Sequence, residues 1–425
     1  MNKFILFFSI CLSVLIRTII VTHSLDVADM KPLYEMGNAL LKGLNPYVAL
    51  QYNIYPPIAL YIEAVSIQLS LILNIPFHII TRLLPNLADI IITLIIYKFL
   101  LRLKTKPIAA ALWSATYILN PVSILVSATH GQIDSIPTLL IIVTIYLLTF
   151  STLRTASALA AISLGLAIAI KPNPAMLIPF FLFFRQTSFK EKFYFLILSA
   201  APTILTLAPF LFPDFQQVIG KVFSYSGVYD FGYSAILRGF WYQQNASIWL
   251  AESLDLLSAS KVIFLLASLI LFILFAGYKN LSKMSLCIYL LFLGIYFGIS
   301  AQYLSWILPL AIIEKDKFII PYSFFASVAI VGFYLFFGPD ILTGNFLHIQ
   351  SFQAEYMLVY FIGNLAFWLL TLWWLIKILN AYIHTTLKTL SPLRKRIIFT
   401  LSLVLVVNLF PLVSLVIKVV QKSVE

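Results

Sequence analysis

Apolar runs of membrane-spanning length recur from one end of the 425-residue chain to the other. A helix needs ~20 apolar residues to cross the hydrocarbon core, where it satisfies its own backbone polar groups. The runs lack the strict alternation of a membrane barrel. The pattern predicts an all-α, polytopic transmembrane bundle of about 12–14 helices in one domain over residues 1–425. Its expected parts are a first helix at 1–22, an outer loop at 23–57 and further helices at 58–425, interrupted by a second outer loop at 213–261.

Composition supports this class. Hydrophobic residues make up 61% of the chain and charged residues 10%, against about 25% charged residues in soluble domains. The net charge of +12 falls in short loops, where it sets topology, so we expect no nucleic acid partner. Cys11 and Cys287 lie far apart inside apolar runs and predict neither a disulfide framework nor a metal site. We expect neither a metal nor a cofactor.

The basic loops give a topology if all of them are cytoplasmic. One region does not fit this topology directly. Two apolar runs, Ile58–Leu73 and Leu83–Leu101, lie between the first outer loop and the first basic loop, where the chain must cross the membrane an odd number of times. Since Ile58–Leu73 carries Glu63 and Gln68, we expect it to dip into the membrane or lie along its surface; the alternative is an N-terminus on the other side. Five polar stretches then share the non-cytoplasmic face: His23–Pro57, Thr129–Ser135, Lys171–Pro174, Pro213–Lys261 and the region of Gln302.

The first outer loop contains an amphipathic helix. Leu33, Met36, Leu40 and Leu41 recur at helical spacing on one face, and Gly43 follows as a helix end. This helix should lie in the membrane interface. Two carboxylates precede it. Asp29 is either its N-cap or a general base, and Asp26 is either a solvated loop residue or a second functional carboxylate.

His130, Gln132 and Asp134 lie together at a junction between two apolar runs, where ionisable groups are expensive and therefore tend to be functional. The plainer interpretation is that the stretch ends one helix and caps the next through Asp134 or Ser135. Lys171 lies on the outer side against the positive-inside pattern. It is either a snorkelling side chain or a point charge for a phosphate.

Two further features carry open alternatives. Asp89, inside Leu83–Leu101, is a buried carboxylate candidate. Its candidate partner is Arg82, seven residues upstream, in an ion pair that is either structural or catalytic. In the second outer loop, Asp230 and Arg238 lie within an aromatic segment that is either an interfacial belt or a platform for a sugar ring or prenyl chain. Its aromatic members are Tyr225, Tyr229, Tyr233, Trp241, Tyr242 and Trp249.

Taken in order, these stretches resemble the GT-C superfamily of integral-membrane glycosyltransferases, in particular the mannosyltransferases related to GPI-anchor synthesis. The similar elements are the acidic first loop with Gly43, Asn45-Pro46-Tyr47 and Tyr55-Pro56-Pro57, then Asn120-Pro121, His130-Gly131-Gln132-Ile133-Asp134-Ser135, Lys171-Pro172 and Gln302-Tyr303-Leu-Ser-Trp306. The likeness extends over about 280 residues. His130 stands where these enzymes usually have Trp.

The resemblance implies an inverting transfer of a hexose, with mannose as the expected sugar, from a polyprenyl-phosphate sugar to a lipid-linked or glycan acceptor. The reaction would take place on the non-cytoplasmic face of the plasma membrane in a prokaryote or of the ER membrane in a eukaryote. Asp29 would take the base position, whereas Asp26 does not match the first Asp of the usual pair. Substrate binding would fall to His130, Gln132, Asp134, Lys171, Arg238, Gln302 and Tyr303.

The chief alternative from another class is a membrane transporter or a flippase of lipid-linked sugars. Transporters tend to show internal repeats and paired broken helices near the bilayer midplane. The chain shows neither pattern, and its polar groups gather toward one face. The residues therefore favour the enzyme over the transporter.

Overall fold

The computed structural model describes residues 2–24, 30–52, 55–184, 187–224, 227–241, 246–275, 278–344, 349–386 and 391–422. Within these ranges the chain forms helices and connecting turns, with a single isolated β-bridge between Phe231 and Ile299. The predicted all-α, polytopic bundle is confirmed.

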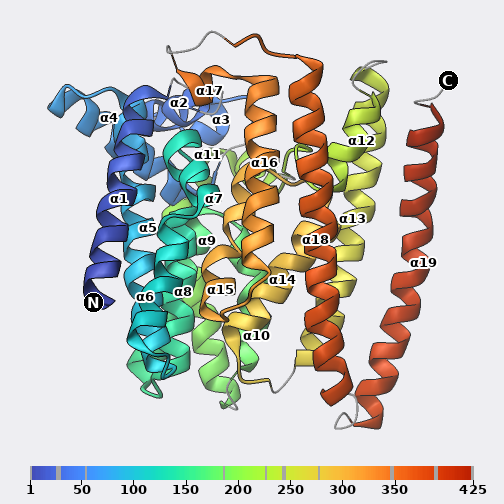
Figure 1. The fold of residues 1–425 in the computed structure, drawn as a ribbon. Helices are drawn as coiled ribbons and strands as arrows, with labels where there is room; N and C mark the ends of the chain where they lie inside the picture. Colours follow the sequence, from blue (N-terminus) through green and yellow to red (C-terminus); the bar gives the residue numbers. More distant parts are fainter. Residues whose placement is uncertain are drawn as a thin grey trace.

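The first part of the chain holds helices on the left of Figure 1 and short segments between them. These elements are α1 (Asn2–His23), α2 (Met30–Leu41), α3 (Pro46–Ala49), α4 (Pro57–Leu73), α5 (Phe77–Arg102), α6 (Pro107–Ile118), α7 (Pro121–Ile124), the π-helical turn η1 (Leu125–His130), α8 (Ser135–Phe150), α9 (Arg154–Ile170), the 3₁₀ turn η2 (Asn173–Leu177), α10 (Ile178–Phe183) and α11 (Phe189–Ser224).

The second part completes the bundle on the right, where α19 forms its edge (Figure 1). Its elements are α12 (Tyr233–Trp241), α13 (Ala246–Phe275), α14 (Leu281–Ile295), the 3₁₀ turn η3 (Ala301–Ser305), α15 (Leu308–Ile313), α16 (Ile319–Phe337), α17 (Asp340–Thr343), α18 (Ala354–Thr386) and α19 (Pro392–Lys422).

Seven described helical segments are long and apolar enough to cross a membrane, and α6 together with α7 and η1 forms either a further span, bent by 41°, or a re-entrant loop. Several other apolar helices are shorter. One of them is α4, with 17 residues, which lies at the upper end of the bundle beside α2 and α3 (Figure 1). That position agrees with the expectation that Ile58–Leu73 does not span.

Small residues allow close helix packing. The contact between α16 and α18 passes through Gly332 and Gly363: a Cβ on Gly332 would stand 2.4 Å from the Tyr360 nitrogen, and one on Gly363 would stand 2.6 Å from the Ala329 nitrogen. Any larger residue would force these helices apart. Backbones that approach through small residues are typical of membrane bundles, where apolar side chains gain little by leaving lipid.

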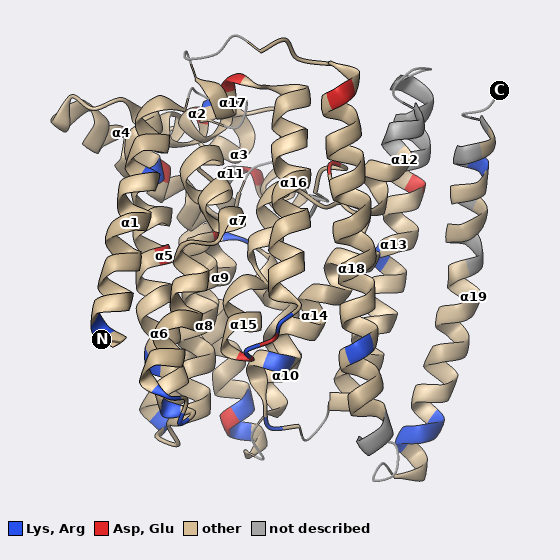
Figure 2. Ribbon diagram, in the orientation of Figure 1, with Lys and Arg blue, Asp and Glu red and all other residues tan. Residues whose placement is uncertain are grey.

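Charge is distributed unevenly along the bundle axis. Lys and Arg gather at the lower end in Figure 2, where the loops after α5, α8 and α18 turn back. Exposed basic residues there include Arg102, Arg154 and Arg394. The upper end holds α17 and the start of α18, which carry Asp340 and Glu355.

Candidate functional site

The predicted amphipathic helix is present as α2. Leu33 and Met36 are buried, as the spacing predicts, whereas Leu41 is 39% exposed and does not belong to the buried face. Gly37 brings α2 onto α4, since a Cβ there would lie 2.7 Å from the Glu63 carbonyl carbon. Gly43, at φ +70°, follows the helix end as predicted. The helix therefore packs on α4.

Asp26 and Asp29, the predicted catalytic carboxylates, lie outside the described residues. The residues on either side of this loop, Ser24 and Met30, are both buried. Met30 packs onto Gly131, because a Cβ added to Gly131 would stand 2.2 Å from the Met30 Cε atom. The described end of the first loop thus contacts the turn of the second polar stretch.

Two Asn-Pro pairs in the resemblance are helix starts. Asn45 caps α3 and Asn120 caps α7, each accepting a hydrogen bond from the backbone nitrogen two residues later, and proline at the first helical position suits this geometry. The α3 start also places Tyr55, since the Tyr47 hydroxyl donates to the Tyr55 carbonyl at 2.9 Å. These motifs build the frame of the site.

The junction between η1 and α8 directs Asp134 into the protein. Gly131 ends η1 at φ +74°, and Asp134 precedes α8 without a side-chain capping bond. Its carboxylate instead accepts from the Lys171 Nζ at 2.5 Å and from the Trp306 Nε1 at 2.7 Å. Asp134 therefore stands at the N-cap position of α8, as the plainer interpretation predicts, but its side chain does not cap the helix.

Lys171 enters the same place from the end of α9. The following proline disfavours helical geometry at Lys171, which is extended at φ −144° and ψ 144°. Its side chain is buried and ion-paired with Asp134, so it does not snorkel. The Nζ atom also lies 5.2 Å from the Tyr55 ring centroid and 5.8 Å from that of Tyr303.

These contacts define the Lys171 cluster, which consists of Tyr55, Gln132, Asp134, Lys171, Tyr303 and Trp306. The Tyr55 hydroxyl donates to Gln132 Oε1 at 3.3 Å, and Tyr303 stacks on Trp306 with ring centroids 4.3 Å apart. Its members come from four separate stretches of the chain. The predicted convergence of Thr129–Ser135, Lys171–Pro174, the first loop and the region of Gln302 is thus present in the structure.

The other predicted binding residues are only partly connected to this cluster. Gln302, next to Tyr303, is buried. His130 is buried and meets the Tyr334 ring edge to face at 5.4 Å between ring centroids. The side chain of Arg238 lies outside the described residues, so the structure does not connect it with Lys171.

A second buried ion pair lies deeper in the first part of the chain. Asp89 pairs with Arg17 at 2.8 Å, so the prediction of Arg82 as its partner is wrong. Arg82 instead donates to the carbonyls of Thr129, at 2.9 Å, and His78, at 3.1 Å. An arginine inside a spanning helix needs a partner. Arg17 lies inside the first apolar run, so the sequence contained a signal that could have identified it as the partner of a buried carboxylate.

Polar neighbours saturate the Arg17–Asp89 pair. Asp89 Oδ1 accepts from the hydroxyls of Tyr117 and Ser135, both at 2.6 Å, and Oδ2 accepts from Arg17 and Ser123. Arg17 in turn donates to side chains on four sides, namely Ser13, Asn86, Asp89 and Ser123. The pair ties together α1, α5, α6, α7 and α8, as a structural element would.

The aromatic segment contributes to protein packing. Tyr229 and Tyr233 lie against Phe297, with ring centroids 4.9 Å and 5.4 Å away, and the Tyr360 hydroxyl donates to the Asp230 carbonyl. Tyr225 and Tyr242 lie outside the described residues, as do the side chains of Trp241 and Trp249. In the described part, these tyrosines belong to an internal cluster.

Burial is the largest cause of the raised pKa of two side chains, Tyr52 in the first outer loop and Glu63 in α4. The pKa of the Tyr52 hydroxyl is raised by burial and then by its hydrogen bond to Glu35. Burial also raises the pKa of Glu63 to about 7, against the lowering effect of a hydrogen bond from Thr81. Within the described ranges, no three His, Cys, Asp or Glu side chains come together to hold a metal ion.

Fold and site together define a polytopic helical membrane protein with a buried polar cluster built from the chain segments that link its helices. Residues 3–226 match the family model of the GPI transamidase subunit PIG-U, so the chain belongs to the PIG-U family. A comparison with curated proteins gave no match. The resemblance to enzymes of GPI-anchor synthesis thus indicated the right pathway, although not the right protein family.

This family membership corrects the predicted function. A PIG-U protein is a subunit of GPI transamidase, which attaches proteins to GPI, so the predictions of a hexosyltransferase and of its transporter or flippase alternative are wrong. The match gives no support to a polyprenyl-phosphate sugar donor. The catalytic roles of Asp26 and Asp29 depended on that reaction, and their positions lie outside the described residues.

Proposed function

We propose that the chain acts as a membrane subunit of a GPI transamidase and that the Lys171 cluster binds the polar head of the GPI lipid. The observation that carries this proposal is the Lys171–Asp134 pair, which is buried but has hydrogen-bonding capacity to spare. An ammonium group has three donors, and Lys171 uses one of them on Asp134 among the described residues. The remaining donors face the rings of Tyr55 and Tyr303.

The chemistry of the cluster suits a glycosylated phospholipid. A lysine ammonium is a compact charge for a phosphate oxygen. The stacked rings of Tyr303 and Trp306 offer flat apolar faces with polar edges, which suit a sugar ring. Asp134 and Gln132 add acceptors for sugar hydroxyls. The predicted binding residues therefore keep a role in recognition, with His130 and Gln302 at the border of the cluster and Arg238 as a further phosphate ligand.

The distribution of basic residues also supports an orientation of the chain in the membrane. The positive-inside rule assigns the basic lower end in Figure 2 to the cytoplasm. The upper end, with α2, α3 and α4, then faces the lumen of the ER. The partners on this proposal are the other protein subunits of the transamidase, membrane lipids and GPI.

The test is to purify the transamidase complex carrying this chain and to quantify the GPI lipid that co-purifies. Lys171→Met should lower bound GPI about tenfold or more, since a charge-assisted hydrogen bond is worth about 1.5–3 kcal/mol. Lys192→Met, which removes a lysine from the basic end, is the matched control and should leave GPI binding unchanged.

Subunit composition separates binding from assembly. The partner subunits should co-purify with Lys171→Met as they do with the wild type. Normal GPI content in an intact Lys171→Met complex would show that the cluster is structural only. Loss of the partner subunits together with GPI would assign Lys171 to folding or assembly.

A further inference from the structure

A groove lies along the contact between α13 and α19. The two helices run in opposite directions at the right of Figure 1 and enclose a space of about 480 Å³. The family match ends at residue 226, before either helix begins. The groove therefore has to be interpreted from its own residues.

Four residues of α13 face the groove at helical spacing. Asp255, Ser258, Ala259 and Val262 recur at i, i+3, i+4 and i+7, so they share one side of the helix. The acidic and hydroxyl groups come first and the apolar groups follow. This face thus changes from polar to apolar along the groove.

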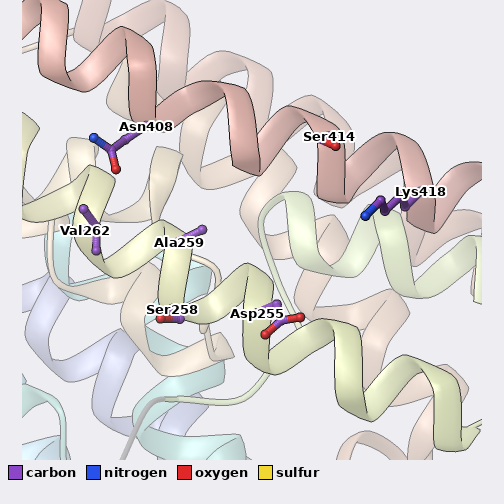
Figure 3. Close-up of a pocket in the computed structure, with 7 residues that line it drawn as sticks. All are labelled: Asp255, Ser258, Ala259, Val262, Asn408, Ser414 and Lys418. Carbon is purple, nitrogen blue, oxygen red and sulfur yellow. The ribbon is translucent and has the colours of Figure 1, made fainter.

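The opposite wall also carries its charged group at one end. On α19, Lys418 and Ser414 lie at the end of the groove that holds Asp255, and Asn408 lies toward Val262 (Figure 3). The Asn408 amide donates to its own helix at Val404. A carboxylate on one helix and an ammonium on the other therefore stand at the same end.

The two charges are not satisfied by each other. Neither Asp255 nor Lys418 forms an ion pair with any described residue, although both line one groove. Both side chains are exposed and lie at the ends of their candidate membrane spans, Leu254–Phe275 and Pro392–Lys418, at the level where charged lipid head groups lie. An occupant that carries both an anion and a cation would satisfy both walls without adding net charge.

We propose that the α13–α19 groove binds a phospholipid whose head group combines a phosphate with a primary ammonium, as phosphatidylethanolamine does. The phosphate accepts hydrogen bonds from Lys418 and Ser414. The ammonium donates to Asp255 and Ser258, and an acyl chain runs along Ala259 and Val262. Head groups held between transmembrane helices by charged side chains follow this logic.

The polarity of the groove favours this lipid over others. A choline head group has no N–H to donate to Asp255, and a glycerol head group has no cation. A transmembrane helix from a partner would have to present both charges at the same depth. The phosphate–ammonium head group matches both walls with one molecule.

The experiment measures lipid retention by the purified full chain with native mass spectrometry. Phosphatidylethanolamine, phosphatidylcholine and phosphatidylglycerol with identical acyl chains are supplied in equal amounts. The wild type should retain the ethanolamine lipid about tenfold over the choline lipid, which corresponds to one charge-assisted hydrogen bond.

Two variants test the two walls of the groove separately. Asp255→Asn should abolish the preference for ethanolamine over choline, because it removes the ammonium partner. Lys418→Met should weaken retention of all three lipids alike, because it removes the phosphate partner. Lys377→Met and Asp340→Asn, which remove exposed charges from α18 and α17, are the matched controls and should behave as the wild type.

Three results would overturn the proposal. The first is equal retention of ethanolamine and choline lipids by the wild type. The second is an unchanged preference in Asp255→Asn with a wild-type thermal midpoint. The third comes from photo-activatable phosphatidylethanolamine: if it labels other parts of the chain but not the peptides around 254–262 and 404–418, the groove belongs to another occupant, such as a partner helix.

Discussion

Two buried ion pairs in this bundle differ in how fully the protein satisfies them. Around Arg17–Asp89, four donors converge on the two carboxylate oxygens. Around Lys171–Asp134, each carboxylate oxygen accepts one hydrogen bond from a described residue. A saturated pair has nothing to offer a ligand, whereas an unsaturated one does. The difference separates a structural pair from a candidate binding site without reference to where each lies in the sequence.

The largest effect should come from breaking the saturated pair. Arg17→Met leaves Asp89 buried without its cation, and removing one partner of a buried pair costs about 3–5 kcal/mol. We expect a much lower thermal midpoint in detergent and poor yield of the folded protein. The double variant Arg17→Met with Asp89→Leu should recover part of the loss, since it removes both charges. A single variant as stable as the wild type would contradict the structural role.

Glu63 is a buried carboxylate that forms no ion pair with a described residue. It accepts from Thr81 at 2.7 Å, and among the described residues its Oε1 has no hydrogen-bond partner. Burial raises its pKa from 4.5 to about 7. The folded state thus retains a proton that the unfolded chain releases, and the stability from this protonation is complete below pH 4.5 and is lost as pH rises through 7.

The corresponding measurement is the thermal midpoint between pH 5 and 8. The free energy of unfolding of the wild type should fall by about 2.5 kcal/mol across this range because of Glu63, since one pKa unit corresponds to about 1.4 kcal/mol. Glu63→Gln should flatten the pH dependence, since the amide mimics the protonated acid. Identical pH profiles for the two proteins would show that Glu63 stays ionised throughout.

Sequence patterns predicted the parts of this molecule that depend on local interactions. Long apolar runs identified the spanning helices, and helical spacing in the first loop identified α2. Partners across the bundle were harder to predict. Arg82 was chosen for Asp89 because it is near in sequence, but the actual partner, Arg17, is 72 residues away. Only the packing of α1 on α5 decides that choice.

Function was predicted less well than the site. The motifs found the residues of the Lys171 cluster, yet a charged and aromatic site for a lipid-linked sugar looks alike in a transferase and in a binding subunit. Residue types at Lys171 or Tyr303 describe what can be held, whereas transfer also requires a positioned base. The family match supplied the distinction that residue chemistry alone could not.

Two single-donor variants are expected to have the smallest effects on stability, and they test most directly whether the two ion pairs differ in their access to a ligand. Trp306→Phe removes the donor to Asp134 Oδ1 and keeps a ring to stack on Tyr303, while Tyr117→Phe removes one of the four donors to Asp89. Each should cost about 1.5–3 kcal/mol, as hydrogen bonds to charged groups do. Added GPI lipid should restore the thermal midpoint of Trp306→Phe, because sugar hydroxyls can replace the lost donor, but should not restore that of Tyr117→Phe. Equal recovery, or none in either variant, would mean that the two pairs do not differ in their access to a ligand.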